Sequence, residues 1–240
     1  MTDSCIISKG TQQRLISDIK DIIKNPLIGD GIYYAHDETK ILAGYAMIVG
    51  PPDTLYEDGV FFFEFLFPPD YPYSPPKLTF KTYDGKTRFH PNLYRNGKVC
   101  LSILNTWRGE QWTSCQTIRS ILLTLVTLFH NEPLLNEPGV TKMHRDFNAY
   151  NDIIKYRNYE VAIYQMITYE KIPPLFSSFY IYVKKHFIEK YDKIMERLEK
   201  ESKKDIKNVR TSLYSMTCKT DYCLLYKLMN EISKKILKLN

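Results

Sequence analysis

Cys100 is the residue with the clearest chemical potential in the sequence, because it shares one polar segment with His90, Asn92 and Lys98. A cysteine thiolate is a nucleophile that can form a thioester, and a thioester can pass its acyl group to an amine. A neutral amide such as that of Asn92 can donate a hydrogen bond to the oxyanion that forms during such a transfer. The local pattern alone is equally typical of a small buried cysteine in the core.

His90 offers a second chemistry, because a cysteine paired with a histidine is also the centre of cysteine proteases. The sequence has no His-Asn or His-Asp partner at protease-like spacing, which argues against a protease. The other cysteines are widely spaced and form no C-x-x-C pair: Cys5, Cys115, Cys218 and Cys223. An odd count without an export signal argues against a disulfide framework, and no metal site is expected.

The elements that would position Cys100 follow an α+β pattern of one helix, four strands and further helices. The first apolar stripe predicts a helix over residues 11–25, capped by Thr11, and consists of Leu15, Ile19, Ile22 and Ile23. Runs rich in Tyr, Phe, Ile and Val predict an antiparallel meander of strands at residues 31–36, 41–49, 60–67 and 78–83. Five prolines within residues 68–76 form a stiff connector in which a cis X-Pro bond is allowed.

Helices are predicted beyond an irregular polar loop at residues 88–105. Apolar periodicity predicts a helix over residues 113–131, capped by Thr113 or Ser114, and two more within about 148–168. After Pro173-Pro174, two helices are expected, at about 176–208 and 221–239. Their apolar stripes need a surface, so the tail should pack on the core. The stripes are Phe179, Val183, Phe187 and Tyr191, then Leu224, Leu228, Ile232 and Ile236.

Positive charge is concentrated in this tail. Residues 1–175 contain 18 Lys+Arg and 19 Asp+Glu, a net of −1, whereas residues 176–240 contain 15 and 8, a net of +7. The near-neutral front part argues against a nucleic-acid-binding core. The tail is interpreted as a solvated Lys-rich face, with an acidic partner as the alternative. Nucleic acid is not expected as a partner, because the basic clusters lack regular aromatic interleaving.

Neither a membrane span nor export is expected from the sequence. The longest apolar stretch, Ile121 to Phe129, has nine residues, about half of the ~20 that a spanning helix needs. No basic segment followed by an apolar one is found near Met1, so no signal peptide is expected and the predicted compartment is the cytosol or nucleus.

Four motifs in order resemble those of ubiquitin-conjugating enzymes. His90-Pro91-Asn92, followed after seven residues by Cys100-Leu101, is similar to the active-site segment of that family. The other three motifs are Tyr71-Pro72-x-x-Pro75-Pro76, Trp112 and Asn136-Glu137-Pro138-Gly139. The resemblance covers residues 11–167 and is strongest to the Z type. Members of this type share the run from Tyr94 to Leu104, place Trp112 twelve residues after the cysteine, and carry a long helical C-terminal extension.

The resemblance implies the α+β UBC fold over residues 1–172, with a basic helical extension over residues 173–240 packed on it. It implies that Cys100 carries ubiquitin or a ubiquitin-like modifier as a thioester and passes it to a lysine. Asn92 would stabilise the oxyanion or support the loop, and His90 would have a structural role, bonding the loop backbone. No metal or organic cofactor is implied, because ATP is used earlier by the activating enzyme. The alternative is a catalytically weak scaffold that binds ubiquitin or a ligase, and intact Cys100 and Asn92 argue against it.

Ser102 departs from the wider family, which often has an Asp there that helps to orient and deprotonate the incoming lysine. The hydroxyl accepts a hydrogen bond but has no charge, and the Z type shares this serine. The resemblance also gives this chain about four extra residues beside the site, in the segment 105–109. That segment is a candidate for part of the lysine-activating function, and its Trp107 is expected to be a packing residue.

Partner surfaces follow from the resemblance position by position. Arg14, Lys20 and Lys24 lie where the family docks on its activating enzyme, which offers acidic groups. Tyr73 and Ser114 match two loops that contact ubiquitin ligases, where the family often has Phe and Pro, and the serine weakens the case for an ordinary RING partner. Simple solvation or edge packing is the alternative for all five. The implied partners are ubiquitin or a ubiquitin-like modifier, an activating enzyme, a ligase and a protein substrate.

Overall fold

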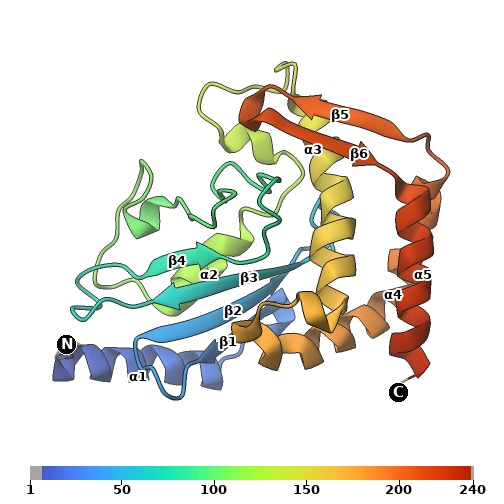
Figure 1. The fold of residues 1–240 in the computed structure, drawn as a ribbon. Coiled ribbons are helices and arrows are strands. Elements are labelled where there is room, and N and C mark those ends of the chain that lie inside the picture. The colour runs from blue at the N-terminus through green and yellow to red at the C-terminus, as the bar shows by residue number, and fades with distance from the viewer. Residues whose placement is uncertain (1–6, 239–240) are drawn as a thin grey trace, which may run out of the picture.

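An antiparallel sheet of four strands lies at the centre of the fold (Figure 1). The computed structural model describes residues 7–238. Consecutive strands are hydrogen-bonded neighbours, which confirms the predicted meander. The strands are β1 (Ile32–His36), β2 (Ala43–Val49), β3 (Val60–Leu66) and β4 (Lys77–Phe80). The proline connector between β3 and β4 contains one cis bond, Tyr71-Pro72.

The described part of the chain also contains five α-helices. They are α1 (Lys9–Lys24), α2 (Ile118–Val126), α3 (Phe147–Arg157), α4 (Tyr180–Ser202) and α5 (Tyr222–Lys238). A π-helical segment, Asn158–Gln165, follows α3 without a break, so the two helices expected at 148–168 form one continuous segment. Short 3₁₀ turns connect the rest: Ile28–Asp30, Ser102–Leu104, Pro133–Asn136, Tyr169–Lys171, Pro174–Phe179 and Leu213–Ser215.

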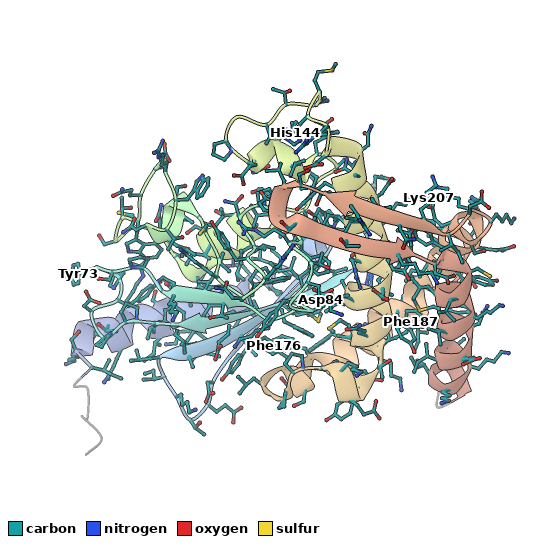
Figure 2. The ribbon with its side chains drawn as sticks, turned by 45° about the horizontal axis from the view of Figure 1, so that its top comes forward. Tyr73, Asp84, His144, Phe176, Phe187 and Lys207 are labelled. Atoms are coloured by element: carbon teal, nitrogen blue, oxygen red, sulfur yellow. The ribbon has the colours of Figure 1, made fainter. Side chains whose placement is uncertain are left out.

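Both faces of β3 are buried. Neighbouring residues of a strand point to opposite faces, and Phe61, Phe62 and Phe63 all have no exposed surface. The ring of Phe61 stacks on Phe129, which follows α2, with 4.4 Å between centroids. The ring of Phe62 meets that of Phe176 in the C-terminal extension, the residue labelled in Figure 2, with 4.7 Å between centroids. Two distant parts of the chain therefore cover the two faces of the sheet.

The structure corrects both predicted helix caps. Ser8, not Thr11, caps α1, because its Oγ accepts a hydrogen bond from Thr11 N at 3.0 Å. Thr117 caps α2 in a capping box with Ser120, so Thr113 and Ser114 lie outside the helix. In each case the sequence offers more than one hydroxyl residue near the start of the helix, and the observed cap is the one whose side chain bonds the backbone N–H three residues later.

The extension contains a β-hairpin that the sequence prediction missed. β5 (Lys207–Thr211) pairs with β6 (Met216–Thr220) between α4 and α5 (Figure 1). α4 accordingly ends at Ser202 rather than near residue 208. The alternating burial of β6 spans only five residues, and β5 is mostly exposed. Without an apolar alternation in β5, the sequence has no strand signal to pair with β6.

Two predicted apolar stripes are also adjusted by the structure. Ile23 is 72% exposed and does not belong to the buried face of α1. On α5, Leu224 is 52% exposed, whereas Leu225 and Met229 are buried. At the start of α5 the buried face therefore lies about one residue further along than predicted, whereas Ile236 of the predicted stripe is buried as expected. The stripe on α4 is as predicted, with Val183 and Phe187 buried.

No helix within residues 7–238 combines the length and the apolar character needed to cross a membrane.

Candidate active site

Two hydrogen bonds join Asn92 and Cys100, one donated by each residue. The Cys100 N–H donates to the carbonyl oxygen of Asn92 at 2.9 Å, and Asn92 Nδ2 donates to the carbonyl oxygen of Cys100 at 2.6 Å. Between them, Leu93 forms a bridge with Val99, and Gly97 adopts a left-handed φ of 85° that glycine tolerates without strain. The loop is thus held in one shape without regular secondary structure.

His90 is fully buried and bonds the backbone of the same loop. Its Nδ1 accepts a hydrogen bond from Asn92 N at 3.0 Å, which places the ring hydrogen on Nε2. Burial lowers the pKa of His90 well below its ordinary value, and the nearby His130 and Arg88 lower it further. A neutral ring whose lone pair is already occupied cannot take a proton from Cys100.

Two buried tyrosines that sequence reasoning missed hold the chain as it enters this loop. Tyr56 OH donates to the carbonyl oxygen of Phe89 at 2.6 Å, and Tyr150 OH donates to that of Arg88 at 2.7 Å. Burial raises the pKa of both hydroxyls well above the ordinary value, so they stay protonated as donors. The contacts span 33 and 62 residues, and no sequence motif marks them.

Beyond Cys100, side-chain hydrogen bonds make the chain turn back on itself. Thr106 Oγ1 accepts from Leu101 N at 2.9 Å. Asn105 adopts a left-handed φ of 57°, and its Oδ1 accepts from Trp112 N at 2.8 Å. The indole of Trp112 is itself fixed, because Nε1 donates to the carbonyl oxygen of Pro72 at 2.7 Å. Trp112 thus ties this segment to the proline connector, and α2 begins six residues later, at Ile118.

The segment 105–109 returns to Ser102. Gly109 has a φ of 128°, and a Cβ at this position would lie 3.1 Å from the Cβ of Ser102. Close approach and backbone conformation together require a glycine here. The side chain of Trp107 is half-buried, and that of Arg108 is exposed. The extra residues therefore lie against the position that departs from the wider family.

The side chain of Cys100 is only 2% exposed. A groove of about 590 Å³ borders the loop, and its walls include Val99, Leu104 and Thr106 on one side and residues 75–79 on the other. A carbonyl carbon must come within bonding distance of the sulfur for a thioester to form. In this conformation the surrounding residues leave little of Cys100 open to such an approach.

A family model described as "Ubiquitin-conjugating enzyme" matches residues 14–158. This range covers more than half of the chain and includes the whole loop from His90 to Cys100. The chain belongs to the ubiquitin-conjugating enzyme family. The match ends before α4, so it leaves the C-terminal extension unassigned.

Several curated proteins are similar to this ubiquitin-conjugating enzyme family member. "Ubiquitin-conjugating enzyme E2 Z" of Danio rerio is 41% identical over 191 residues, which cover 77% of this chain and 57% of that protein. The E2 Z of Xenopus tropicalis is 43% identical over 158 residues, covering 64% and 50%. "Ubiquitin-conjugating enzyme E2" of African swine fever virus (strain Badajoz 1971 Vero-adapted) is 36% identical over 140 residues, covering 57% and 62%.

The chain spans about half the length of the E2 Z proteins that it matches. Among solved structures, human ubiquitin-conjugating enzyme E2 G1 is 33% identical, with a TM-score of 0.44, and covers 55% of this chain and 99% of that one. The family assignment rests on the sequence matches. They support the resemblance to the Z type.

The five residues matched to partner surfaces differ in their surroundings. Lys20, Lys24, Tyr73 and Ser114 are exposed, and Tyr73 lies at the opposite end of the molecule from the extension hairpin (Figure 2). Arg14 is instead engaged within the chain. Its Nε donates to Asp18 at 2.9 Å, and its other nitrogens donate to the carbonyl oxygens of Ser114 and Gln116.

Within residues 7–238, no group of three His, Cys, Asp or Glu side chains is placed to hold a metal ion. The four described cysteines are free thiols. Cys218 lies on β6 of the hairpin, which packs on α3, and it is buried there. This burial raises the pKa of its thiol. Cys115 and Cys223 are exposed, away from the His90–Asn92 loop in sequence. Cys5 lies outside the described residues.

Proposed function

We propose that the chain is a ubiquitin-conjugating enzyme that accepts ubiquitin, or a ubiquitin-like modifier, on Cys100 and transfers it to a lysine. The observation that carries this proposal is the reciprocal pair of hydrogen bonds between Asn92 and Cys100. These bonds keep an amide side chain beside the only cysteine in the family's active-site segment. The sequence similarity to proteins named ubiquitin-conjugating enzyme E2 Z also supports this proposal.

The transfer moves one acyl group from one thiol to another and then to an amine, with no change of oxidation state. The Cys100 thiolate attacks the carbonyl carbon of the thioester on the activating enzyme, the new C–S bond forms, and the activating enzyme's cysteine leaves as a thiolate. A lysine amine then attacks the same carbon. The C–N bond forms, the C–S bond to Cys100 breaks, and the amine loses one proton to solvent while Cys100 leaves as a thiolate.

Asn92 and His90 would have different roles in this reaction. Asn92 Nδ2 carries two hydrogens, and the carbonyl of Cys100 takes one of them. The second hydrogen would serve an oxyanion, while the first supports the loop. His90 would act through the backbone of Asn92 alone. Ser102 would contribute a hydroxyl to the lysine site, and a lysine-activating role of residues 105–109 stays a prediction.

The partners would be an activating enzyme, a ligase and a protein substrate. Lys20 and Lys24 are the better candidates for contact with the activating enzyme, because Arg14 is committed to bonds within the chain. Tyr73 and Ser114 would contribute to ligase contact. Residues 1–172 would form the conjugating domain and residues 173–240 a basic extension packed on it. The compartment would be the cytosol or nucleus.

The test is the formation of a thioester with ubiquitin and a panel of activating enzymes, followed on non-reducing gels. We expect wild-type protein to give an adduct that thiol reagents remove. Cys100→Ala should abolish the adduct, and Cys100→Ser should abolish it or leave an oxyester that resists thiols. Cys115→Ser and Cys223→Ser are matched controls on exposed thiols and should load normally. An adduct on Cys100→Ala would overturn the proposal.

A further inference from the structure

The turn that joins β5 and β6 in the extension is pressed onto the active-site segment. Tyr214 lies at its tip, with the ring 4.7 Å from Arg88 Cζ. Its hydroxyl donates to Glu137 Oε2 at 2.5 Å. Glu137 belongs to the Asn136-Glu137-Pro138-Gly139 motif. One side chain of the extension thus contacts two segments around the loop of Cys100, from a distance of 77 residues or more in sequence.

The backbone of this turn is held in an unfavourable conformation. Tyr214 has a φ of 61° and the following Ser215 a φ of 45°. Left-handed backbone is disfavoured for residues other than glycine, and it persists where surrounding contacts impose it. Two such residues in succession also occur in the tight turns of β-hairpins. The contacts of Tyr214, rather than its backbone conformation, therefore show where the turn is held.

Arg88 connects Tyr214 to the loop that carries Asn92. Its guanidinium lies 3.3 Å from the centre of the Tyr94 ring, so it is enclosed between two aromatic faces. Its Nε donates to the carbonyl oxygen of Pro91 at 3.2 Å, and Pro91 directly precedes Asn92. Because the guanidinium is rigid and planar, an aromatic ring on its face restricts where its N–H groups point.

Other contacts hold the same turn to both ends of the loop. The guanidinium of Arg95 donates to the backbone carbonyl oxygen of Tyr214. The Arg88 N–H points at the sulfur of Met216 at 3.3 Å. Leu213 N donates to Asp146 Oδ2 at 2.8 Å. The turn therefore holds the chain on either side of His90-Pro91-Asn92.

We propose that Tyr214 is a positioning residue for the transfer step, through which the extension fixes Arg88, Pro91 and hence the amide of Asn92 in the geometry needed for discharge of Cys100. This inference rests on the proposed function. The inference means that the full rate of transfer depends on a contact made by the extension. A misplaced donor lowers the rate of transfer without removing the nucleophile.

The test measures discharge of preformed ubiquitin thioester to free lysine in a single turnover. Only folded, loaded molecules contribute to this rate constant, so partial unfolding does not imitate the effect. We expect Tyr214→Ala to lower the maximal discharge rate by about 10-fold, within the range seen for misplaced catalytic groups. The lysine concentration at half-maximal rate should stay unchanged. Tyr214→Phe keeps the ring on Arg88 and should retain most of the rate.

A matched control removes another tyrosine of the extension. Tyr182 on α4 packs on Tyr33 of β1, with 4.8 Å between ring centroids, and is 42% exposed. Tyr182→Ala also loses an extension contact and should discharge at the wild-type rate. Arg88→Lys should be as slow as Tyr214→Ala, and the double variant should be no slower than either, because both act through one chain of contacts.

Wild-type discharge by Tyr214→Ala, or an equal loss in Tyr182→Ala, would overturn the inference while leaving Cys100 as the acyl carrier. Independent, multiplying effects of Tyr214→Ala and Arg88→Lys would also contradict it. Failure of wild-type protein to load at all would overturn the proposed function, and the inference with it. Circular dichroism and melting curves of each variant show whether the loaded fraction represents the native fold.

Discussion

The active-site loop and the C-terminal extension are held in place by different kinds of contact. In the loop, short-range bonds between side chains and backbone dominate, such as those from Asn92 to Cys100 across eight residues. The extension is held by aromatic rings and charges that meet the core across more than 100 residues, as Arg197 does with Glu57 and Asp58. Local bonds fix a geometry for chemistry, whereas long-range burial supplies stability.

The extension contacts different parts of the described core through different side chains, so the roles of these contacts can be tested separately. Phe176 and Arg197 anchor the extension on the sheet and on the loop before β3, whereas Tyr214 reaches the site. Changes at the first two should alter stability with little effect on the reaction of folded molecules. Changes in the His90–Asn92 segment should alter the reaction more than the stability.

The largest expected effect on stability is at Phe176. The ring has no exposed surface and lies against Phe62 and Tyr45, with centroid distances of 4.7 and 5.5 Å. Removing such a ring costs about 3–5 kcal/mol. We expect Phe176→Ala to lower the melting temperature by about 10 °C, at roughly 2–4 °C per kcal/mol. Ile181→Ala, at a position 68% exposed on α4, is the control and should melt like the wild type.

Loading of Cys100 in Phe176→Ala, measured well below its melting temperature, should stay near the wild-type level. An unchanged melting temperature would mean that the extension does not stabilise the sheet. Complete loss of loading at a temperature where the variant is folded would mean that the two regions cannot be separated in this way.

A smaller effect, on chemistry rather than stability, is expected at Asn92. If its amide stabilises the oxyanion, Asn92→Ala should slow discharge to free lysine by about 10²-fold, the scale of losing one such donor. Loading should suffer less. Asn96→Ala is the matched control, because Asn96 lies in the same loop, is exposed, and accepts a hydrogen bond from Lys98 N at 3.1 Å.

Melting curves and single-turnover discharge distinguish the two roles of Asn92, oxyanion stabilisation and loop support. Discharge that falls only with the folded fraction would assign it to loop support alone.

The sequence predicts the parts of this molecule whose contacts are local. The four strands follow from their runs of Tyr, Phe, Ile and Val, whereas the burial of Phe61, Phe62 and Phe63 on both faces of β3 is a finding of the structure. The spacing from Asn92 to Cys100 is fixed by bonds within the loop, so a motif can represent it. Tyr56 and Tyr150 could not be found this way, because their hydroxyls reach the loop from 33 and 62 residues away.

The extension shows the opposite case. The hairpin β5–β6 was missed because β5 is polar and mostly exposed, so it lacks an apolar alternation, and the polar sequence before it was included in the predicted helix. Its position depends on partners such as Asp146, 67 residues before Leu213. The amphipathic pattern of α4 was recognised, but the buried face at the start of α5 was not, since Leu224 and Leu225 are both apolar and only packing on α4 decides between them. Tertiary context overrides such ambiguous local signals.

The smallest expected effect on the extension concerns a charge cluster and depends on pH. Asp58 is 7% exposed, and its carboxylate accepts from His186 Nε2 at 2.8 Å and from the guanidinium of Arg197 on α4. Burial by itself raises the pKa of Asp58, but the hydrogen bonds and charges of His186 and Arg197 outweigh it and leave the pKa below the ordinary value of 3.8. A carboxylate with a lowered native pKa stabilises the fold above its unfolded pKa, and this contribution is lost as the pH falls through the native value.

We expect Asp58→Asn to be less stable than wild type by about 1–3 kcal/mol at pH 7, less than the ~3–5 kcal/mol of a fully buried pair, because Arg197 is 29% exposed. Asparagine tolerates the left-handed φ of 61° at this position, so the substitution removes charge without adding backbone strain. Urea midpoints at pH 7, 5, 4 and 3 should show the difference shrinking below about pH 4, as the wild-type carboxylate itself takes up a proton. Glu196→Gln weakens an exposed pair with Lys200 on the same helix, which also lowers the pKa of Glu196, and because this pair is solvent-screened its dependence on pH should be much smaller. A difference that stays constant from pH 7 to pH 3 would mean that Asp58 holds the extension by shape rather than by charge.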